Sequence, residues 1–140
     1  MSTITKVTMI TFVLGVLTLA SGHWIWPPNP MNGSPSSALM PHFLLVAFME
    51  SLAFGLGVSY LVLGWHRLCA VGSVTRSKLR WTHLAIVWSL MSWWPHDNLH
   101  QHIGTNFEKL IYLEYGFHVT LILSALLIAH TFWKILSEKA

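Results

Sequence analysis

The sequence predicts an all-α integral membrane protein, a four-helix bundle that forms a single transmembrane domain over residues 1–140. Two features of composition predict this class. Hydrophobic residues make up 54% of the chain and charged residues 9%, whereas roughly a quarter of the residues of a soluble domain are charged. Four apolar segments also approach the roughly 20 residues that a helix needs to cross a bilayer.

The four membrane spans are expected at about residues 5–24, 42–65, 79–95 and 109–133. The first segment also resembles a secretory signal, because Lys6 precedes an apolar run that ends in small residues; we interpret it as a retained span. The second span is interrupted only by Glu50, and the third is short. The fourth carries two ionisable residues, Glu114 and His118.

Basic residues predict the orientation of these spans. Seven of the eight Lys and Arg residues lie at the N-terminus, in the second connection or at the C-terminus, and only Lys109 lies on the other side. Because cytoplasmic loops are enriched in Lys and Arg, we expect a multi-pass protein of the cell inner membrane with both termini cytoplasmic. The Pro-rich connection at residues 24–41 cannot be helical, and we expect it to cap the outer end of the bundle.

Three ionisable residues, Glu50, Glu114 and His118, fall inside the predicted spans. Each costs on the order of 2–3 kcal/mol there, so such a group normally faces a partner or a cavity. Glu114 and His118 are four residues apart and therefore share one face of the fourth helix. We interpret Glu50, Asp97 and Glu114 as candidate catalytic groups, with Asp97 also able to ligate a metal or to orient a histidine ring.

The densest group of polar residues is the segment 95–102, Pro-His-Asp-Asn-Leu-His-Gln-His. If it is helical, His96 and His100 project together; if it is extended, His100 and His102 do. Imidazole and carboxylate groups suit Zn, Cu or Fe, so the predicted metal ligands are His96, His100, His118 and Glu114. Haem stays open as well, because it needs only one or two axial histidines in an apolar pocket.

Each of these interpretations has a structural alternative. Interfacial histidines can be solvated, amphipathic residues, and we expect this of five of them taken singly: His23, His66, His83, His102 and His130. The pair of Glu114 and His118 can fix the register of packed helices, and Glu50 can be a protonated residue that is hydrogen-bonded between helices. No standard metal signature such as His-Glu-x-x-His is present.

One junction resembles a known family. Gly33-Ser34-Pro35, six further residues and then His42 at the start of the second span resemble the corresponding stretch of the styrene oxide isomerases. That family consists of small, trimeric four-helix membrane proteins with cytoplasmic termini, which use ferric haem b as a Lewis acid on an epoxide oxygen. The resemblance implies that His42 is a cofactor-binding residue, the axial ligand of haem b. The histidines of segment 95–102 and the Glu114–His118 pair are not features of that family.

These observations favour a metal- or haem-dependent membrane protein with its site near the outer membrane face. We expect an enzyme, an isomerase or oxidoreductase, that acts on a small apolar substrate from the bilayer and works as a homo-oligomer. One alternative is an accessory subunit of a larger membrane complex. A second is a proton or ion pathway through Glu50, Glu114 and His118. We expect no nucleic-acid partner, because no run of basic residues alternates with aromatic ones.

Overall fold

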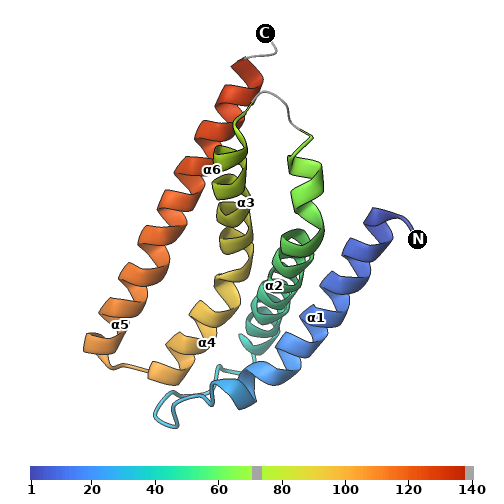
Figure 1. Ribbon diagram of the computed structural model, residues 1–140. Coiled ribbons are helices and arrows are strands. Elements are labelled where there is room, and N and C mark those ends of the chain that lie inside the picture. Colours follow the sequence, from blue (N-terminus) through green and yellow to red (C-terminus); the bar gives the residue numbers. More distant parts are fainter. Residues whose placement is uncertain (71–73, 138–140) are drawn as a thin grey trace.

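The computed structural model describes residues 1–70 and 74–137, and over these residues the regular structure is helical (Figure 1). The helices are, in order, α1 (Thr3–Ile25), α2 (Met40–Leu68), α3 (Arg76–Met91), α4 (Trp93–Ile103), α5 (Phe107–Glu114), the π-helical turn η1 (Tyr115–Val119) and α6 (Thr120–Ser137). Within the described residues, three helical stretches are long and apolar enough to cross a membrane: α1, α2 and the continuous rod Phe107–Ser137. The prediction of an all-α protein with membrane-spanning helices is confirmed to this extent.

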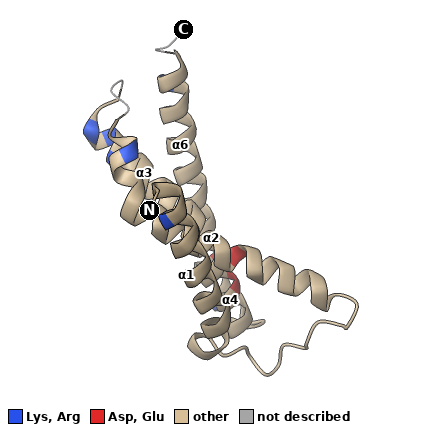
Figure 2. Ribbon diagram, turned by 90° about the vertical axis from the view of Figure 1, so that its right-hand side faces the viewer, with Lys and Arg blue, Asp and Glu red and all other residues tan. Residues whose placement is uncertain are grey.

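The long helices form an open row, not a closed bundle. α1 packs against α2, α2 against α3, and α3 against α6, whereas α1 and α6 stand apart at the two ends of the row (Figure 1). α4 continues from the lower end of α3, whereas the start of α1 and the end of α6 lie toward the upper end of the helices (Figure 1). Lys and Arg residues gather at the upper end of α3 (Figure 2).

Small residues hold α1 against α2. A Cβ atom on Gly55 would lie 2.4 Å from the Thr11 carbonyl oxygen, and one on Gly15 would lie 2.9 Å from Leu52 Cδ2. Such small residues let helix backbones approach closely in a membrane, where apolar surface alone does not drive association. The interface between α1 and α2 therefore depends on the absence of side chains at these two glycines.

Hydroxyl groups join α3 to α6. The Oγ1 atoms of Thr82 and Thr131 lie 2.8 Å apart, and both residues are almost fully buried. Interhelical hydrogen bonds of this kind contribute about 0.6 kcal/mol on average in a membrane protein. The large apolar side chains of the row mostly point outward, as a lipid-facing surface requires.

Pro95 lies just after the junction between α3 and α4. It has no N–H to donate to the carbonyl of Met91, so the hydrogen-bond ladder is broken where α3 ends. Ser92 separates the two helices, and α4 continues to Ile103, where Gly104 ends it with a φ of 65°. Residues 93–103 are helical despite this proline, because Pro is tolerated in the first turn of a helix.

The Pro-rich connection between α1 and α2 lies against the end of α4. The backbone N–H of Asn29 donates to the Gln101 carbonyl at 2.9 Å, and the Asn32 side-chain amide donates to the same oxygen at 2.7 Å. Nδ1 of His102 lies 2.8 Å from the Pro27 carbonyl. As predicted, the connection folds over the end of the helices. His102 has a specific structural role there, which the interpretation of a solvated residue did not include.

Candidate metal centre and a second polar cavity

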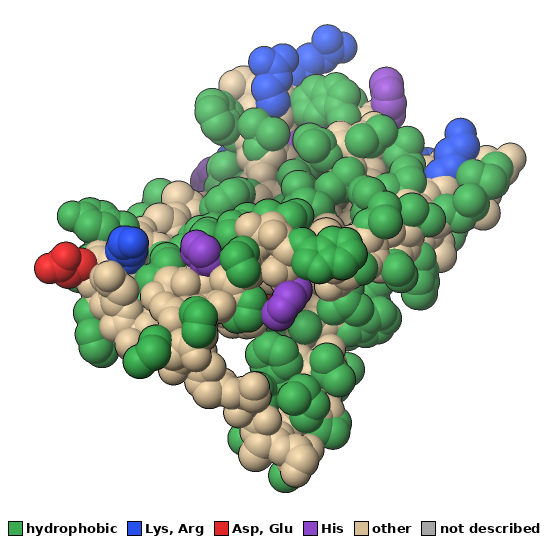
Figure 3. Space-filling view, turned by 90° about the horizontal axis from the view of Figure 1, so that it is seen from below, with side chains coloured by type: hydrophobic (Ala, Val, Ile, Leu, Met, Phe, Trp, Pro, Cys, Tyr) green, Lys and Arg blue, Asp and Glu red, His purple; other side chains and the backbone are tan. Residues whose placement is uncertain are grey.

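α4 carries two polar faces. Side chains four residues apart project from the same side of a helix, so His96 lies with His100, and Asp97 lies with Gln101. His96 and His100 form one face, which meets Glu114 of α5. Asp97 and Gln101 form the other face, which lines a cavity against α1 and α2. The helical alternative for segment 95–102 is therefore the one that the structure adopts. Figure 3, seen from this end of the molecule, shows histidine side chains at the surface among mostly hydrophobic ones.

The first face brings three metal-ligand types together. Nε2 of His100 lies 2.8 Å from Glu114 Oε1 and 3.1 Å from His96 Nε2. One nitrogen or oxygen atom from each of the three residues lies within 4.8 Å of the others, and among the described residues no other such group of three or more occurs. Around a tetrahedral zinc ion, ligand atoms stand about 3.3 Å apart. The separations from His100 to Glu114 and to His96, 2.8 and 3.1 Å, are both within about half an ångström of this spacing.

His118 supports this group from the side. Its Nδ1 lies 2.7 Å from Oε2 of Glu114, the carboxylate oxygen that His100 does not contact. Its ring also lies beside that of His96, with centroids 5.1 Å apart. Partners of this kind fix the orientation of a metal-ligating group. The predicted ligand His118 therefore lies at the site, where the geometry gives it the role of orienting Glu114.

The π-helical turn η1 begins directly after Glu114 and contains His118. Thr120 Oγ1 lies 2.6 Å from the Gly116 carbonyl oxygen, to which its hydroxyl donates, and it accepts the Trp88 Nε1–H at 2.9 Å. The Trp88 ring also stacks on Phe117, with centroids 5.6 Å apart. Single π-helical turns occur frequently at functional sites. Sequence analysis did not find Trp88, Phe117 or Thr120, because a π-helical turn has no simple sequence signal.

The surroundings of His96 favour its neutral form. Burial first, and then the neighbouring His100 and His118, lower the pKa of His96 below 6.5, the ordinary value for histidine. Glu114 and Asp97 act in the opposite direction and are smaller influences. Because only the neutral ring has a lone pair to offer a metal, this environment suits a ligand.

An apolar groove leads to the group formed by His96, His100, Glu114 and His118 (the histidine cluster). It has a volume of about 450 Å³ and runs beside α6, and its lining consists of Ser89, Trp93, His118, Leu121, Ile122 and Ala125. His118 is the only ionisable residue among them. The groove opens where exposed leucine and isoleucine side chains of α6 would face lipid. It is therefore an apolar groove that reaches the His118 side chain.

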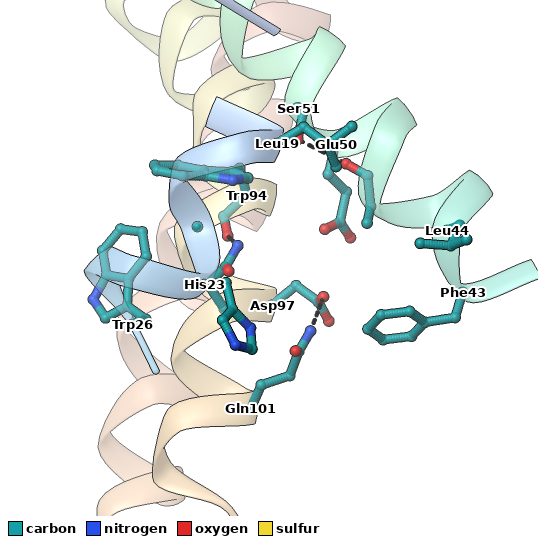
Figure 4. A pocket seen from close by; sticks show the side chains of 13 residues that line it. Leu19, His23, Trp26, Phe43, Leu44, Glu50, Ser51, Trp94, Asp97 and Gln101 are labelled. Atoms are coloured by element: carbon teal, nitrogen blue, oxygen red, sulfur yellow. Dashed lines mark hydrogen bonds between the residues drawn. The ribbon is translucent and has the colours of Figure 1, made fainter. Parts of the chain in front are cut away.

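The second face of α4 borders a separate cavity of about 220 Å³. The carboxylates of Glu50 and Asp97 point into the same space, and the ring of Phe43 approaches it from the side (Figure 4). Asp97 accepts a hydrogen bond from Gln101 Nε2 at 2.9 Å. Of the three predicted catalytic residues, the structure thus places Glu114 in the histidine cluster, and Glu50 and Asp97 in this cavity.

The other predicted histidines are scattered. His42 is exposed in the first turn of α2 and is not part of the histidine cluster. His66 and His130 are also exposed. His83 is only 4% exposed and packs between the rings of Tyr60 and Trp65, so the expectation that it is solvated is wrong. Its burial follows from the position of α3 in the middle of the row.

Comparison with protein-family models, curated proteins and solved structures finds no match to this chain. The functional argument therefore depends on the geometry of these side chains.

Proposed function

We propose that this chain is a membrane-embedded metalloenzyme in which His96, His100 and Glu114 bind one divalent metal ion. His118 holds the carboxylate of Glu114 in place. The helices cross the membrane four times, with α3 and the start of α4 as the third crossing, and both termini face the cytoplasm. The observation that carries the proposal is the convergence of two imidazoles and one carboxylate within 4.8 Å.

Two histidines and one carboxylate form a ligand set with known chemical uses. Three protein ligands leave coordination positions open for water or substrate, as in catalytic zinc sites and in non-haem iron oxygenases. A bound ion would supply Lewis acidity or, in the case of iron, redox chemistry. The chain itself contributes the ligands, the orientation of Glu114 and an apolar groove that excludes water.

The groove beside α6 supports a small apolar substrate. Its lining offers no charged group besides His118, so it would bind an uncharged molecule better than a polar one. An isomerase or oxidoreductase that takes its substrate from lipid fits this arrangement. The resemblance of residues 33–42 to styrene oxide isomerases suggests an epoxide as one substrate class to try.

Haem b bound through His42 is the second candidate. The observation in its favour is that His42 is exposed and, among the described residues, has no hydrogen-bond or ring partner. The open row also leaves apolar helix faces for a second copy or a larger complex to cover. The ion-pathway alternative has less support, because Glu50 lies across α4 from Glu114 and His118.

The test is metal analysis and absorption spectroscopy of the detergent-purified protein. We expect about one metal ion per chain, with His96→Ala, His100→Ala and Glu114→Ala each lowering the affinity by about 100-fold or more. His118→Ala should cost about 10–100-fold, as loss of an orienting partner typically does. His66→Ala and His130→Ala, at exposed positions outside the cluster, are the matched controls.

A different result would choose another function. A Soret band that disappears in His42→Ala and persists in His100→Ala would support the haem alternative. Full metal occupancy in His100→Ala and Glu114→Ala would contradict the proposed site. A protein with neither metal nor haem would leave the accessory subunit as the better description.

The proposed topology has its own test in cysteine labelling. A membrane-impermeant thiol reagent added from outside should label cysteine at position 36 in the Pro-rich connection. It should not label cysteine at position 137, near the C-terminus. Seven of the eight basic residues lie on the same side as position 137, which is therefore expected to be cytoplasmic. Labelling of position 137 from outside would overturn the orientation.

A further inference from the structure

The cavity between α1, α2 and α4 is distinct from the proposed metal centre. Its wall contains two carboxylates, from Glu50 and Asp97, together with His23 and the side-chain amides of Asn98 and Gln101. Among the residues that the structure describes, no Lys or Arg lines it. In Figure 4 the two carboxylates point into one space from different helices. A positive group between two carboxyl groups that face each other in a partly enclosed space stabilises their ionised forms.

Aromatic rings make up much of the rest of the wall. The rings of Trp26, Phe43 and Trp94 line the cavity, and those of Trp26 and Trp94 pack edge to face, with centroids 4.9 Å apart. Trp94 is only 7% exposed and is held on its other side by Phe54. Aromatic faces attract organic cations, and most strongly when they are shielded from water.

The spacing of the acidic groups favours a molecule over a bare metal ion. The residues of this cavity do not form a group of three or more ligand atoms within 4.8 Å, whereas those of the histidine cluster do. A volume of about 220 Å³ is also much larger than a metal ion needs. It corresponds to roughly seven water molecules at about 30 Å³ each.

We propose that this cavity binds the ammonium group of a small organic cation. Glu50 and Asp97 neutralise the positive charge, and the aromatic rings contact the methyl or methylene groups around the nitrogen. Gln101 donates to Asp97 and so keeps that carboxylate turned toward the cavity. The cation belongs either to a free amine or to the headgroup of a lipid, since Phe43 and Leu44 border the cavity on the exposed side of α2.

The experiment measures equilibrium binding of choline to the detergent-purified full chain. We expect choline to bind and its neutral tert-butyl isostere, which has the same shape, to bind about tenfold more weakly or worse. Glu50→Gln and Asp97→Asn should each weaken choline binding by about tenfold, because each replaces a carboxyl group that can ionise beside the cation by a neutral amide of nearly the same volume. Glu108→Gln, which removes an exposed charge outside the cavity, is the matched control and should leave choline binding unchanged.

Several results would overturn the proposal. Equal binding of choline and its isostere would show that charge has no part in recognition. Absence of choline binding, or equal affinity in Glu50→Gln, Asp97→Asn and Glu108→Gln, would show that the cavity is not the site. The isostere comparison uses the unchanged chain, so it stands even if a cavity variant fails to fold.

Nanodiscs distinguish the two sources of the cation. The same choline measurement is made in phosphatidylglycerol nanodiscs and in phosphatidylcholine nanodiscs. If phosphatidylcholine alone blocks choline, the ligand is a lipid headgroup. If choline binds equally in both, the ligand is a free amine. If choline binds in neither, the proposal fails.

Discussion

Each side of α4 faces a group of polar side chains, and the two groups differ in composition and in how closely they converge. On one side, His100 contacts both His96 and Glu114, with donor and acceptor atoms 2.8–3.1 Å apart. On the other side, Glu50 and Asp97 border a cavity of about 220 Å³. Close convergence suits a single ion, and separated groups around a space suit a molecule. The comparison teaches that spacing and residue type together decide what a polar site can bind.

Loss of Glu114 should separate the two sites most clearly. Glu114→Ala removes the only carboxylate of the histidine cluster and also frees His100 and His118, which both contact it. We expect metal affinity to fall by about 100-fold or more, since even an orienting partner typically contributes 10–100-fold. Choline affinity, measured in the same preparation, should stay within about twofold of the unchanged chain. If metal affinity and choline affinity both fall in Glu114→Ala, the two sides of α4 form one site.

A substitution between α1 and α2 should weaken choline binding and leave metal binding nearly unchanged. Gly55→Leu places a side chain where a Cβ atom would already lie 2.4 Å from the Thr11 carbonyl oxygen, so α1 must move. Overpacking of this kind typically costs 1–3 kcal/mol. Because α1 forms one wall of the cavity, we expect choline affinity to fall by about tenfold, with metal affinity nearly unchanged.

Gly33→Leu is the control for this substitution, because a Cβ atom on Gly33 would meet nothing within 4 Å. It makes the same change of residue at an open position. If Gly33→Leu and Gly55→Leu weaken choline binding equally, the loss does not come from the α1–α2 interface.

Acidification should destabilise the histidine side of α4 in the metal-free chain. The pKa of His96 is lowered in the folded chain, so the unfolded chain takes up the proton first as the pH falls. The stability that this neutral ring contributes is therefore complete above about pH 6.5 and is lost as the pH falls through the lower, folded value. Thermal unfolding of the metal-free chain between about pH 7.5 and about pH 5 should show this decline. His96→Asn should reduce the decline, and an unchanged decline would assign it to other groups.

The smallest expected effect concerns the π-helical turn. Thr120→Val keeps the shape of the side chain and removes the hydroxyl that joins Trp88 to the Gly116 carbonyl. We expect metal affinity to fall by a few-fold, less than the 10–100-fold typical of a direct partner of a ligand. Thr120→Ser keeps the hydroxyl and should restore the affinity. Spectroscopy of the cobalt-substituted protein would report the change in ligand geometry. Equal spectra for Thr120→Val and Thr120→Ser would show that the Thr120 hydroxyl does not affect the metal site.

Much of the helical architecture could be predicted from composition and hydropathy. The apolar segments at 5–24, 42–65 and 109–133 all lie within observed helices, because a long apolar run has few alternatives to a helix. The end of the third segment, at Pro95, could not be predicted in this way. Pro95 lies in the first turn of α4, and sequence alone does not distinguish a helix start from a helix end at a proline.

The site was predictable in part. The four-residue spacing placed His96 with His100, and Glu114 with His118, and the structure brings the two pairs together. The position of Asp97 could not be predicted in the same way. It is adjacent to His96 in sequence, but neighbours on a helix point about 100° apart. Which of the two faces met Glu114 and which met Glu50 depended on how α4 packs.

The π-helical turn of residues 115–119 has a consequence for insertions and deletions in this chain. It adds one residue to a helical rod that makes specific contacts on both sides of it, Glu114 with α4 before the turn and Thr131 with Thr82 after it. Each residue of an α-helix advances the direction of side chains by about 100°. Deleting one residue from the turn would therefore rotate Thr131 away from α3 or Glu114 away from His100. The extra residue acts as a register adjustment that lets one helix meet two partners, so the length of this segment is constrained even where its side chains are not.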